Sequence, residues 1–338
     1  MPDEPLPASG TSARRWLVSS GKLVVAASLI AYLIDSGRIR LSLLAAVSPA
    51  WVAVTALCML AALLLPCLRW WWLLRYQGVD IPLAAAVRLT WIGYFFSAIL
   101  PGAASGDLAR AYYLLKDTPQ ARLRAASTVL IDRGLGLYSL FFLGLVPAGI
   151  LLLHGQGTRA VLWMGLTALG LAGASSAAIA LLLYSPTRRM VLRVLPARLR
   201  PSVEECLSLY RSHSRGMLAC LALSLLANAC NALAFAPSAR ALGSLTPVSA
   251  SFLVAPLVIL ANALPISPGG LGVAESASAA LFGSLSIAHG AEMMLLLRIA
   301  IVLWALPGAL LYVTSRSRAR PFVPASARRR GLPSEQEE

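Results

Sequence analysis

Six long apolar stretches dominate this chain of 338 residues. A helix needs about 20 consecutive apolar residues to cross the hydrocarbon core of a bilayer, and each stretch is close to or above that length. The stretches cover residues 17–34, 48–74, 125–153, 158–184, 216–242 and 291–314. With 58% hydrophobic and 13% charged residues, the composition excludes a water-soluble domain with a polar surface. The sequence therefore predicts an all-α polytopic membrane protein with six transmembrane helices.

Basic residues predict how these helices are oriented. Arginines and lysines, among them Arg69 and Arg75 at the end of the second stretch, flank the apolar stretches mostly on one side, which the positive-inside rule assigns to the cytoplasm. We therefore expect a multi-pass protein of the cell (inner, cytoplasmic) membrane with both termini in the cytoplasm. The formal net charge of +15 is then explained by orientation and by contact with anionic lipid headgroups. Nucleic acid is not an expected partner, because the chain has no basic binding module.

The chain divides into a membrane domain and two tails. We expect a cytoplasmic N-terminal tail at residues 1–15, a transmembrane domain at 16–315, and a disordered basic cytoplasmic tail at 316–338. The connection at 185–215 mixes apolar residues with arginines, which predicts interfacial helices on the cytoplasmic leaflet.

Some aromatic and amide residues are assigned to structure rather than to binding. We expect a tryptophan run at the end of the second span to anchor it at the membrane interface, in preference to a substrate platform. Asparagines inside the spans are expected to join helices to one another. These residues are Trp70, Trp71, Trp72, Asn228, Asn231 and Asn262.

Two further apolar stretches, residues 82–115 and 247–287, are interrupted by proline and glycine. Pro101-Gly102 breaks the first, and the segment from Pro265 to Gly270 breaks the second. Each fits two half-helices joined at the break, where freed backbone groups must be buried in protein or line a wet cavity. Three predicted spans separate the stretches, so they enter from opposite faces. The sequence thus predicts two inverted re-entrant helical hairpins, an architecture typical of alternating access.

The first break leads to charged residues. Asp107 and Arg110 are three positions apart, so on a helix they share a face and can pair. One interpretation is a structural clamp. The other adds that the small residues from Gly102 through Ser105 to Gly106 leave backbone N–H groups open at a helix start, where they and Arg110 can hold a phosphate.

The third span carries an adjacent charged pair. Asp132 and Arg133 point about 100° apart around a helix, so they cannot neutralise one another and each needs another partner. Arg133 is a candidate ligand for a lipid headgroup, and Asp132 a candidate partner for Arg110 or Arg88. A purely structural network between hairpin and span is the alternative.

The second break leads to Glu275. This carboxylate follows Gly269 and Gly270 and lies one turn into the predicted second half-helix, where the N-terminal dipole favours it. It is interpreted as a local cap, as a proton-coupled switch, or as a ligand for a cationic headgroup. Arg298 in the last span is its candidate counter-charge.

The sequence indicates neither a metal site nor a cofactor site. The three histidines are isolated, and the cysteines show no metal-binding or redox spacing. Gly270-Leu271-Gly272 lacks the third glycine and the preceding strand of a dinucleotide site. No cofactor and no catalytic residue are therefore assigned. The cysteines are Cys58, Cys67, Cys206, Cys220 and Cys230.

From about residue 15 to 315, the chain resembles the transmembrane, flippase-like domain of the lysylphosphatidylglycerol synthase family. Two positions depart from the family pattern: Ser97 replaces a usual asparagine, and Ser105 replaces a common glycine. The resemblance rests on Arg69-Trp70 with Leu73-Leu74 and Gly78, Gly93-Tyr94-Phe95-Phe96, Pro101-Gly102, Gly106-Asp107 with Arg110, Asp132-Arg133, and Pro265 to Gly272 with Glu275.

The resemblance implies a module that moves a lipid headgroup between leaflets. In the full-length synthases a separate soluble domain makes the aminoacylated lipid, and these residues contain no such domain, so aminoacyl transfer from tRNA is not expected of this chain. The expected partners are membrane lipids, anionic or phosphate-bearing, and enzymes of envelope-lipid biosynthesis. Two alternatives remain open: an integral membrane lipid-modifying transferase, and a non-catalytic partner of a lipid or envelope biosynthesis complex.

Overall fold

The structure is a computed structural model that describes residues 47–99, 105–117, 122–155, 157–183, 213–264 and 266–317, with the single residues 35, 200 and 204. Every regular element of these described residues is a helix. The predicted span at 17–34, the tail predicted at 1–15 and most of the predicted interfacial loop lie outside this part of the chain. So does the tail predicted at 316–338, except that residues 316 and 317 belong to the last helix.

Five helical segments are long and apolar enough to cross a membrane. They confirm five of the predicted spans, with ends shifted by three residues or fewer. The helices that form them are α3 (Pro49–Tyr76), α6 (Arg122–Leu143) with α7 (Leu145–Leu153), α8 (Arg159–Leu183), α11 (Ser214–Leu233) with α12 (Phe235–Ala241), and α15 (Gly290–Ser317).

Two of these segments are interrupted at the same distance from a proline. The helix α6 ends at Leu143, four residues before Pro147, and α11 ends at Leu233, four residues before Pro237. A proline cannot donate to the carbonyl four residues earlier, and its ring clashes with that carbonyl. The breaks between α6 and α7 and between α11 and α12 follow from this local chemistry.

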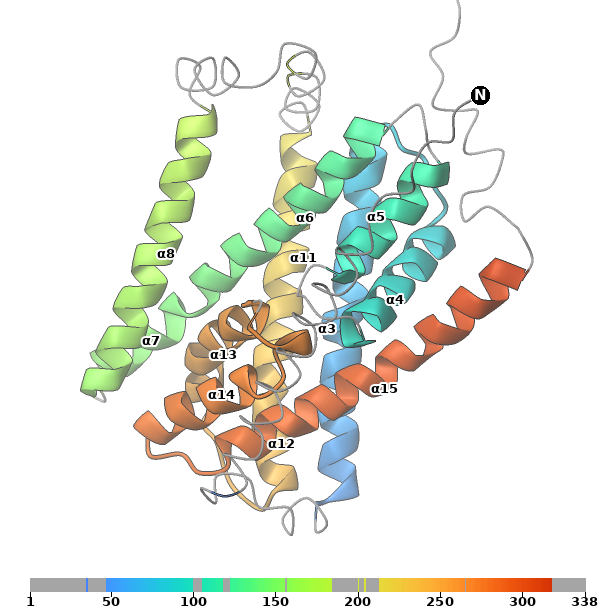
Figure 1. Cartoon of the computed structure of the whole chain (residues 1–338). Coiled ribbons are helices and arrows are strands. Elements are labelled where there is room, and N and C mark those ends of the chain that lie inside the picture. The colour runs from blue at the N-terminus through green and yellow to red at the C-terminus, as the bar shows by residue number, and fades with distance from the viewer. Residues whose placement is uncertain are drawn as a thin grey trace, which may run out of the picture.

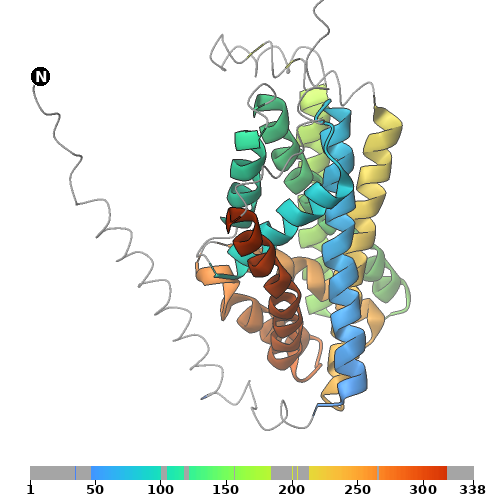
Figure 2. The same cartoon turned by 90° about the vertical axis from the view of Figure 1, so that its right-hand side faces the viewer.

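Four shorter helices form two pairs. The first pair is α4 (Leu83–Ile99) and α5 (Ser105–Asp117). The second is α13 (Val248–Ala263) and α14 (Val273–Ser284), with the 3₁₀ turn η2 (Pro268–Gly270) between them. Figures 1 and 2 show the first pair toward one end of the bundle and the second toward the other. The hinge residues 100–104 and Pro265 lie outside the described residues, so re-entrant hairpins remain a prediction.

The long helix α15 contacts both pairs. Near its start, the Gly290 carbonyl accepts a 2.6 Å hydrogen bond from Ser278 of α14. Farther along, the Trp304 carbonyl accepts a 2.9 Å bond from the indole of Trp91 on α4. A Cβ on Gly308 would collide with the Trp91 carbonyl, so glycine permits this close approach. The α15 helix therefore joins the two ends of the bundle.

The two largest apolar cores are built from different sets of helices. The larger surrounds Phe235 and Phe282 and is built mainly from α12, α13, α14 and α15. The smaller contains Trp70, Leu89 and Leu114 from α3, α4 and α5. Burying these side chains fixes the helices that carry the charged residues described next.

Candidate functional site

A buried ion pair joins the second and third predicted spans. Arg69 of α3 donates from Nε to Asp132 Oδ1 of α6 at 2.7 Å. Only 7% of the arginine side chain and 4% of the aspartate side chain are exposed. A buried charge without a partner costs several kcal/mol, so each residue requires the other. Asp132 lies eight residues inside the apolar segment Arg124–Leu153, about 12 Å along the helix from its start.

Arg110 of α5 extends this pair into a chain. Its Nη2 lies 2.8 Å from Asp132 Oδ2 and 3.0 Å from Asp107 Oδ1. The guanidinium carbon lies 4.7 Å from the centre of the Trp70 ring, a cation–π contact on α3. The indole of Trp70 donates in turn to Thr128 at 3.2 Å. Arg110 is thus held by two carboxylates and an aromatic face.

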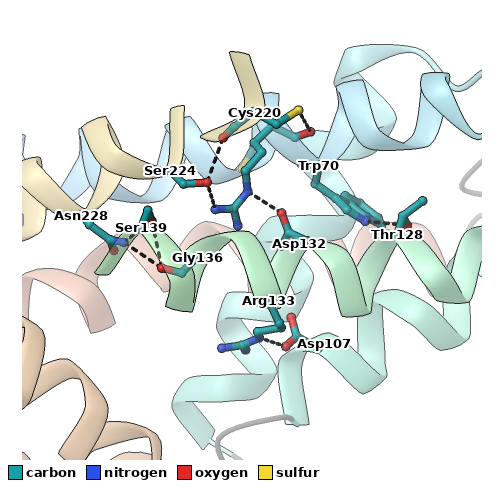
Figure 3. A network of polar contacts seen from close by, with 12 residues as sticks. Trp70, Asp107, Thr128, Asp132, Arg133, Gly136, Ser139, Cys220, Ser224 and Asn228 are labelled. Atoms are coloured by element: carbon teal, nitrogen blue, oxygen red, sulfur yellow. Dashed lines mark hydrogen bonds and ion pairs between the residues drawn. The ribbon is translucent and has the colours of Figure 1, made fainter. Parts of the chain in front are cut away.

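Arg133 ends the chain on the exposed side. Its Nε donates to Asp107 Oδ2, and 51% of its side chain is exposed, against 15% for Asp107. Figure 3 shows Asp132 pointing toward α3 and α11, whereas Arg133 points toward α5. Arginine and aspartate therefore alternate from the interior outward, and we call this series the ion-pair chain: Arg69, Asp132, Arg110, Asp107 and Arg133.

Uncharged polar residues of α11 complete the interior end of the network (Figure 3). Ser224 accepts from Arg69 Nη1 at 2.7 Å and donates to the Cys220 carbonyl at 2.8 Å. Asn228 donates to the Gly136 carbonyl at 3.0 Å and to Ser139 at 2.8 Å on α6. The prediction that Asn228 joins helices is confirmed.

A second charged cluster surrounds Glu275 on α14. This carboxylate is fully buried and accepts from both Nε and Nη2 of Arg298 on α15. It also accepts a 2.7 Å bond from the Gly272 N–H, which caps the helix. The predicted helix cap and the predicted ion pair with Arg298 are thus both present.

Arg298 also holds the backbone of the second break. Its Nη1 donates to the Gly269 carbonyl at 2.8 Å, and its Nη2 to the Gly270 carbonyl at 3.2 Å and to Asn262 Oδ1 at 3.3 Å. Gly269 and Gly270 have φ of 57° and 69°, and a Cβ on Gly270 would collide with Asn262. Glycine is therefore required for the carbonyls to converge on one guanidinium.

The two clusters approach one another at Ser97 near the end of α4. A Cβ on Gly269 would lie 3.8 Å from the Ser97 carbonyl oxygen. On the other side, a Cβ on Gly106 would collide with the Ser97 hydroxyl and with the Gly93 carbonyl. Ser97 therefore lies between the backbone of the second break and the helix that carries Asp107 and Arg110.

The structure brings together most of the predicted site residues in two groups. The first group contains Gly106 and four of the charged residues, and Ser105 lies beside it, its hydroxyl 3.4 Å from the Phe96 carbonyl. Gly102 lies outside the described residues. The first group is Gly106, Asp107, Arg110, Asp132 and Arg133; the second is Gly269, Gly270, Glu275 and Arg298.

Two residues of this polar network, Arg69 and Trp70, lie in places other than those expected from the sequence. Arg69 was grouped with the cytoplasmic basic residues, yet it is the innermost cation of the ion-pair chain. Trp70 was expected to anchor the membrane interface, but it is fully buried beneath Arg110. A signal was present: Leu73 and Leu74 follow Arg69 and Trp70 by four positions each, which places the four residues on one side of a helix. All four are buried.

Among the described residues, no group of three or more histidine, cysteine, aspartate or glutamate side chains lies close enough to hold a metal ion. The carboxylates described above pair with arginines.

Long apolar helices around paired interior charges define a polytopic, all-helical integral membrane protein with a polar centre. Within that class, the chain belongs to the family of the lysylphosphatidylglycerol synthase TM region, whose sequence profile matches residues 20–310. It is therefore an integral membrane protein of a lipid-metabolism family. No curated protein matches the chain.

Proposed function

We propose that this protein is a lipid translocase that moves the headgroup of a phospholipid or related amphiphile between leaflets by alternating access. The observation that carries the proposal is the convergence of two charged clusters, each next to a break in an apolar segment, on opposite sides of Ser97. Broken helices whose polar ends meet inside the membrane are typical of transporter sites. Family membership supports a role in lipid metabolism.

A polar headgroup needs such a centre because the hydrocarbon core offers it no partners. Charged side chains in apolar spans are costly and serve function by default. Here the cost is reduced by ion pairs, while Arg133 keeps half of its side chain exposed. That arginine is the point of the ion-pair chain at which a headgroup can first make contact.

The arrangement of the short helices supports alternating access. The ion-pair chain lies on α3, α5 and α6, whereas Glu275 lies on α14 and pairs with Arg298 of α15, and Figure 1 shows α5 and α14 toward opposite ends of the bundle. Ser97 lies next to both sides. A displacement of either helix pair changes this contact, so opening toward one leaflet is coupled to closing toward the other.

The test is transbilayer movement of a fluorescent phospholipid in vesicles that contain the purified protein. An impermeant reductant bleaches the outer leaflet, and movement appears as bleaching of the inner pool. We expect movement with the wild-type protein and a loss of roughly tenfold or more for Glu275→Gln and Arg298→Gln, as expected when about 1.4 kcal/mol of a required interaction is removed. Arg159→Gln, at the exposed start of α8, is the matched control.

Two results would overturn the proposal. One is a bleaching curve for wild-type vesicles that matches vesicles without protein. The other is a wild-type rate from both variants when thermal unfolding shows them to be folded. Mass spectrometry of the same lipids checks the chemistry, because a newly modified lipid would identify a transferase instead.

A further inference from the structure

We infer that the seam between α5 and α6 is a lateral gate, which parts to let a lipid pass between the bilayer and the polar centre. This inference rests on the proposed function and names the element that opens. The seam is the line along which α5 faces α6. It is crossed by the ion pairs Arg110–Asp132 and Arg133–Asp107, and Figure 3 shows the second of them.

The aspartates do not depend on the contacts across the seam alone. Asp132 also binds Arg69 of α3 at 2.7 Å, and Asp107 also lies 3.0 Å from Arg110 of its own helix. When the seam parts, each carboxylate therefore keeps one arginine. A buried carboxylate without a partner is strongly destabilising, and this arrangement avoids that state.

The arginines tolerate the same separation. Arg110 keeps Asp107 and the ring of Trp70 on α3, whose centre lies 4.7 Å from the guanidinium carbon. Arg133 has half of its side chain exposed, so the loss of Asp107 costs little. Separating α3 from α6 instead would leave buried Arg69 without a carboxylate among the described residues. The seam between α5 and α6 is thus where the ion-pair chain opens at least cost.

One buried donor stays unsatisfied while the seam is closed. Within the part of the chain that the structure describes, Arg110 Nε has no hydrogen-bond partner, although the residue is buried and its Nη2 lies near two carboxylates. Such donors are rare because leaving one unpaired is destabilising. Parting of the seam admits water to this nitrogen. The closed state is therefore less stable than its ion pairs alone suggest.

Apolar packing holds the other end of the seam. Leu114 of α5 and Ala125 of α6 are both buried in the smaller apolar core. Leu114 follows Asp107 by seven residues and Ala125 precedes Asp132 by seven residues, which is two helical turns, or about 10 Å, in each case. Only residues 118–121 separate α5 from α6 in the chain at this end. The pivot therefore lies at the apolar end, and the opening lies at the charged end.

The charged end of the seam faces the bilayer. Leu130, Arg133 and Leu137 are spaced three and four residues apart, which places them on one face of α6. Leu130 is 76% exposed, and on α5 Leu108, the neighbour of Asp107, is 69% exposed. Exposed leucines beside a membrane-spanning segment face acyl chains. A lipid whose chains stay in the bilayer can therefore bring its polar part through this seam.

Spin labels on both sides of the seam measure its opening. The native cysteines are replaced, and Leu108→Cys and Leu137→Cys carry the labels in the purified full chain, because both sites are exposed and the ion pairs stay intact. Double electron–electron resonance gives the distance distribution. We expect Arg133→Gln to raise the ratio of the longer to the shorter distance by roughly two- to fivefold. Arg159→Gln should leave the ratio unchanged.

A second labelled pair controls for general loosening of the bundle. Leu64→Cys on α3 and Leu226→Cys on α11 are exposed sites, and the hydrogen bond from Arg69 to Ser224 joins their helices without crossing the seam. The distance between these labels should not respond to Arg133→Gln. An unchanged seam distribution in Arg133→Gln would overturn the gate, and so would an equal change at both labelled pairs.

Linking the seam tests whether translocation needs it to open. A bis-maleimide reagent that matches the shorter measured distance joins Leu108→Cys to Leu137→Cys, and its thioether bonds resist the reductant used in the vesicle assay. We expect transbilayer movement to fall roughly tenfold or more relative to the same variant capped with N-ethylmaleimide. The same linker across Leu64→Cys and Leu226→Cys should leave the rate unchanged. Mass spectrometry measures the linked fraction.

The two proposals fail separately. If vesicles show protein-dependent movement that persists when the seam is fully linked, the gate is wrong and translocation stands. If the distance ratios follow the charge change but no lipid moves in any vesicle, the seam opens and the translocase proposal fails.

Discussion

Arg69 and Asp132 form a 2.7 Å ion pair between α3 and α6 although 63 positions separate them in the chain. The second oxygen of the same carboxylate accepts from Arg110 of α5. One aspartate thus neutralises guanidinium groups from two other helices. The four predictions that follow concern the contacts that hold this centre together.

Asp132→Ala should be strongly destabilising, because it leaves Arg69 and Arg110 buried without a shared partner. We expect the free energy of unfolding to fall by about 3–5 kcal/mol, the range for breaking a buried ion pair. Thermal unfolding in detergent, followed by circular dichroism, measures the effect. Arg159→Gln, at the exposed start of α8, is the control, and equal melting temperatures for the two variants would contradict the prediction.

Gly106→Ala should separate α4 from α5. The added methyl group collides with the Ser97 hydroxyl and with the Gly93 carbonyl, and the backbone carbonyl cannot rotate away. Overpacking of this kind costs about 1–3 kcal/mol. Gly170→Ala on α8 is the matched control, because nothing lies within 4 Å of its Cβ and alanine favours a helix. Melting temperatures should fall for the first variant and stay or rise for the second.

Glu275→Ala should destabilise more than Glu275→Gln. Glutamine can still accept from the Gly272 N–H but loses the charge that faces Arg298, whereas alanine loses both contacts. The cap alone accounts for about 0.5–2 kcal/mol of the difference between the two variants. Both should be compared by thermal unfolding. A glutamine variant as unstable as the alanine variant would mean that the backbone cap contributes nothing.

Trp70→Ala should cost about 3–5 kcal/mol, since it empties a fully buried site and removes the ring beneath Arg110. Trp70→Phe keeps an aromatic face and should cost less, through the lost bond to Thr128. Adding Thr128→Val to the Trp70→Phe variant also removes the hydroxyl that accepts the bond from the Trp70 indole in the wild type. If thermal unfolding shows additive losses from these two substitutions, they are not coupled through that hydrogen bond.

Hydrophobic length was sufficient to predict the long helices. The stretch predicted at 48–74 is the helix Pro49–Tyr76, and the one at 291–314 is Gly290–Ser317. This success follows from the bilayer, which requires continuous apolar helices of nearly fixed length. The breaks after Leu143 and Leu233 were not predicted, although Pro147 and Pro237 were visible, because other helices of this chain continue through prolines such as Pro307.

Charged pairs could be predicted from the sequence where the partners lie close together in the chain, or where the spans offer few charged residues to choose from. Asp107 with Arg110 follows from helical spacing, and Arg298 was a plausible counter-charge for Glu275 because few charges lie in the spans. Arg69 was missed because an arginine near a span end has the same sequence context whether it faces headgroups or the bundle interior. Only the packing of α3 against α6 and α11 shows that Arg69 faces the bundle interior.

The close contact of Gly308 with Trp91 has a mechanical consequence for α15. Trp304 and Tyr312 of the same helix also contact α4, whereas Arg298 lies about 15 Å along the helix from Gly308, beyond these contacts. A displacement of α4 against α15 would therefore be transmitted along one continuous helix to the guanidinium that binds the Gly269 and Gly270 carbonyls.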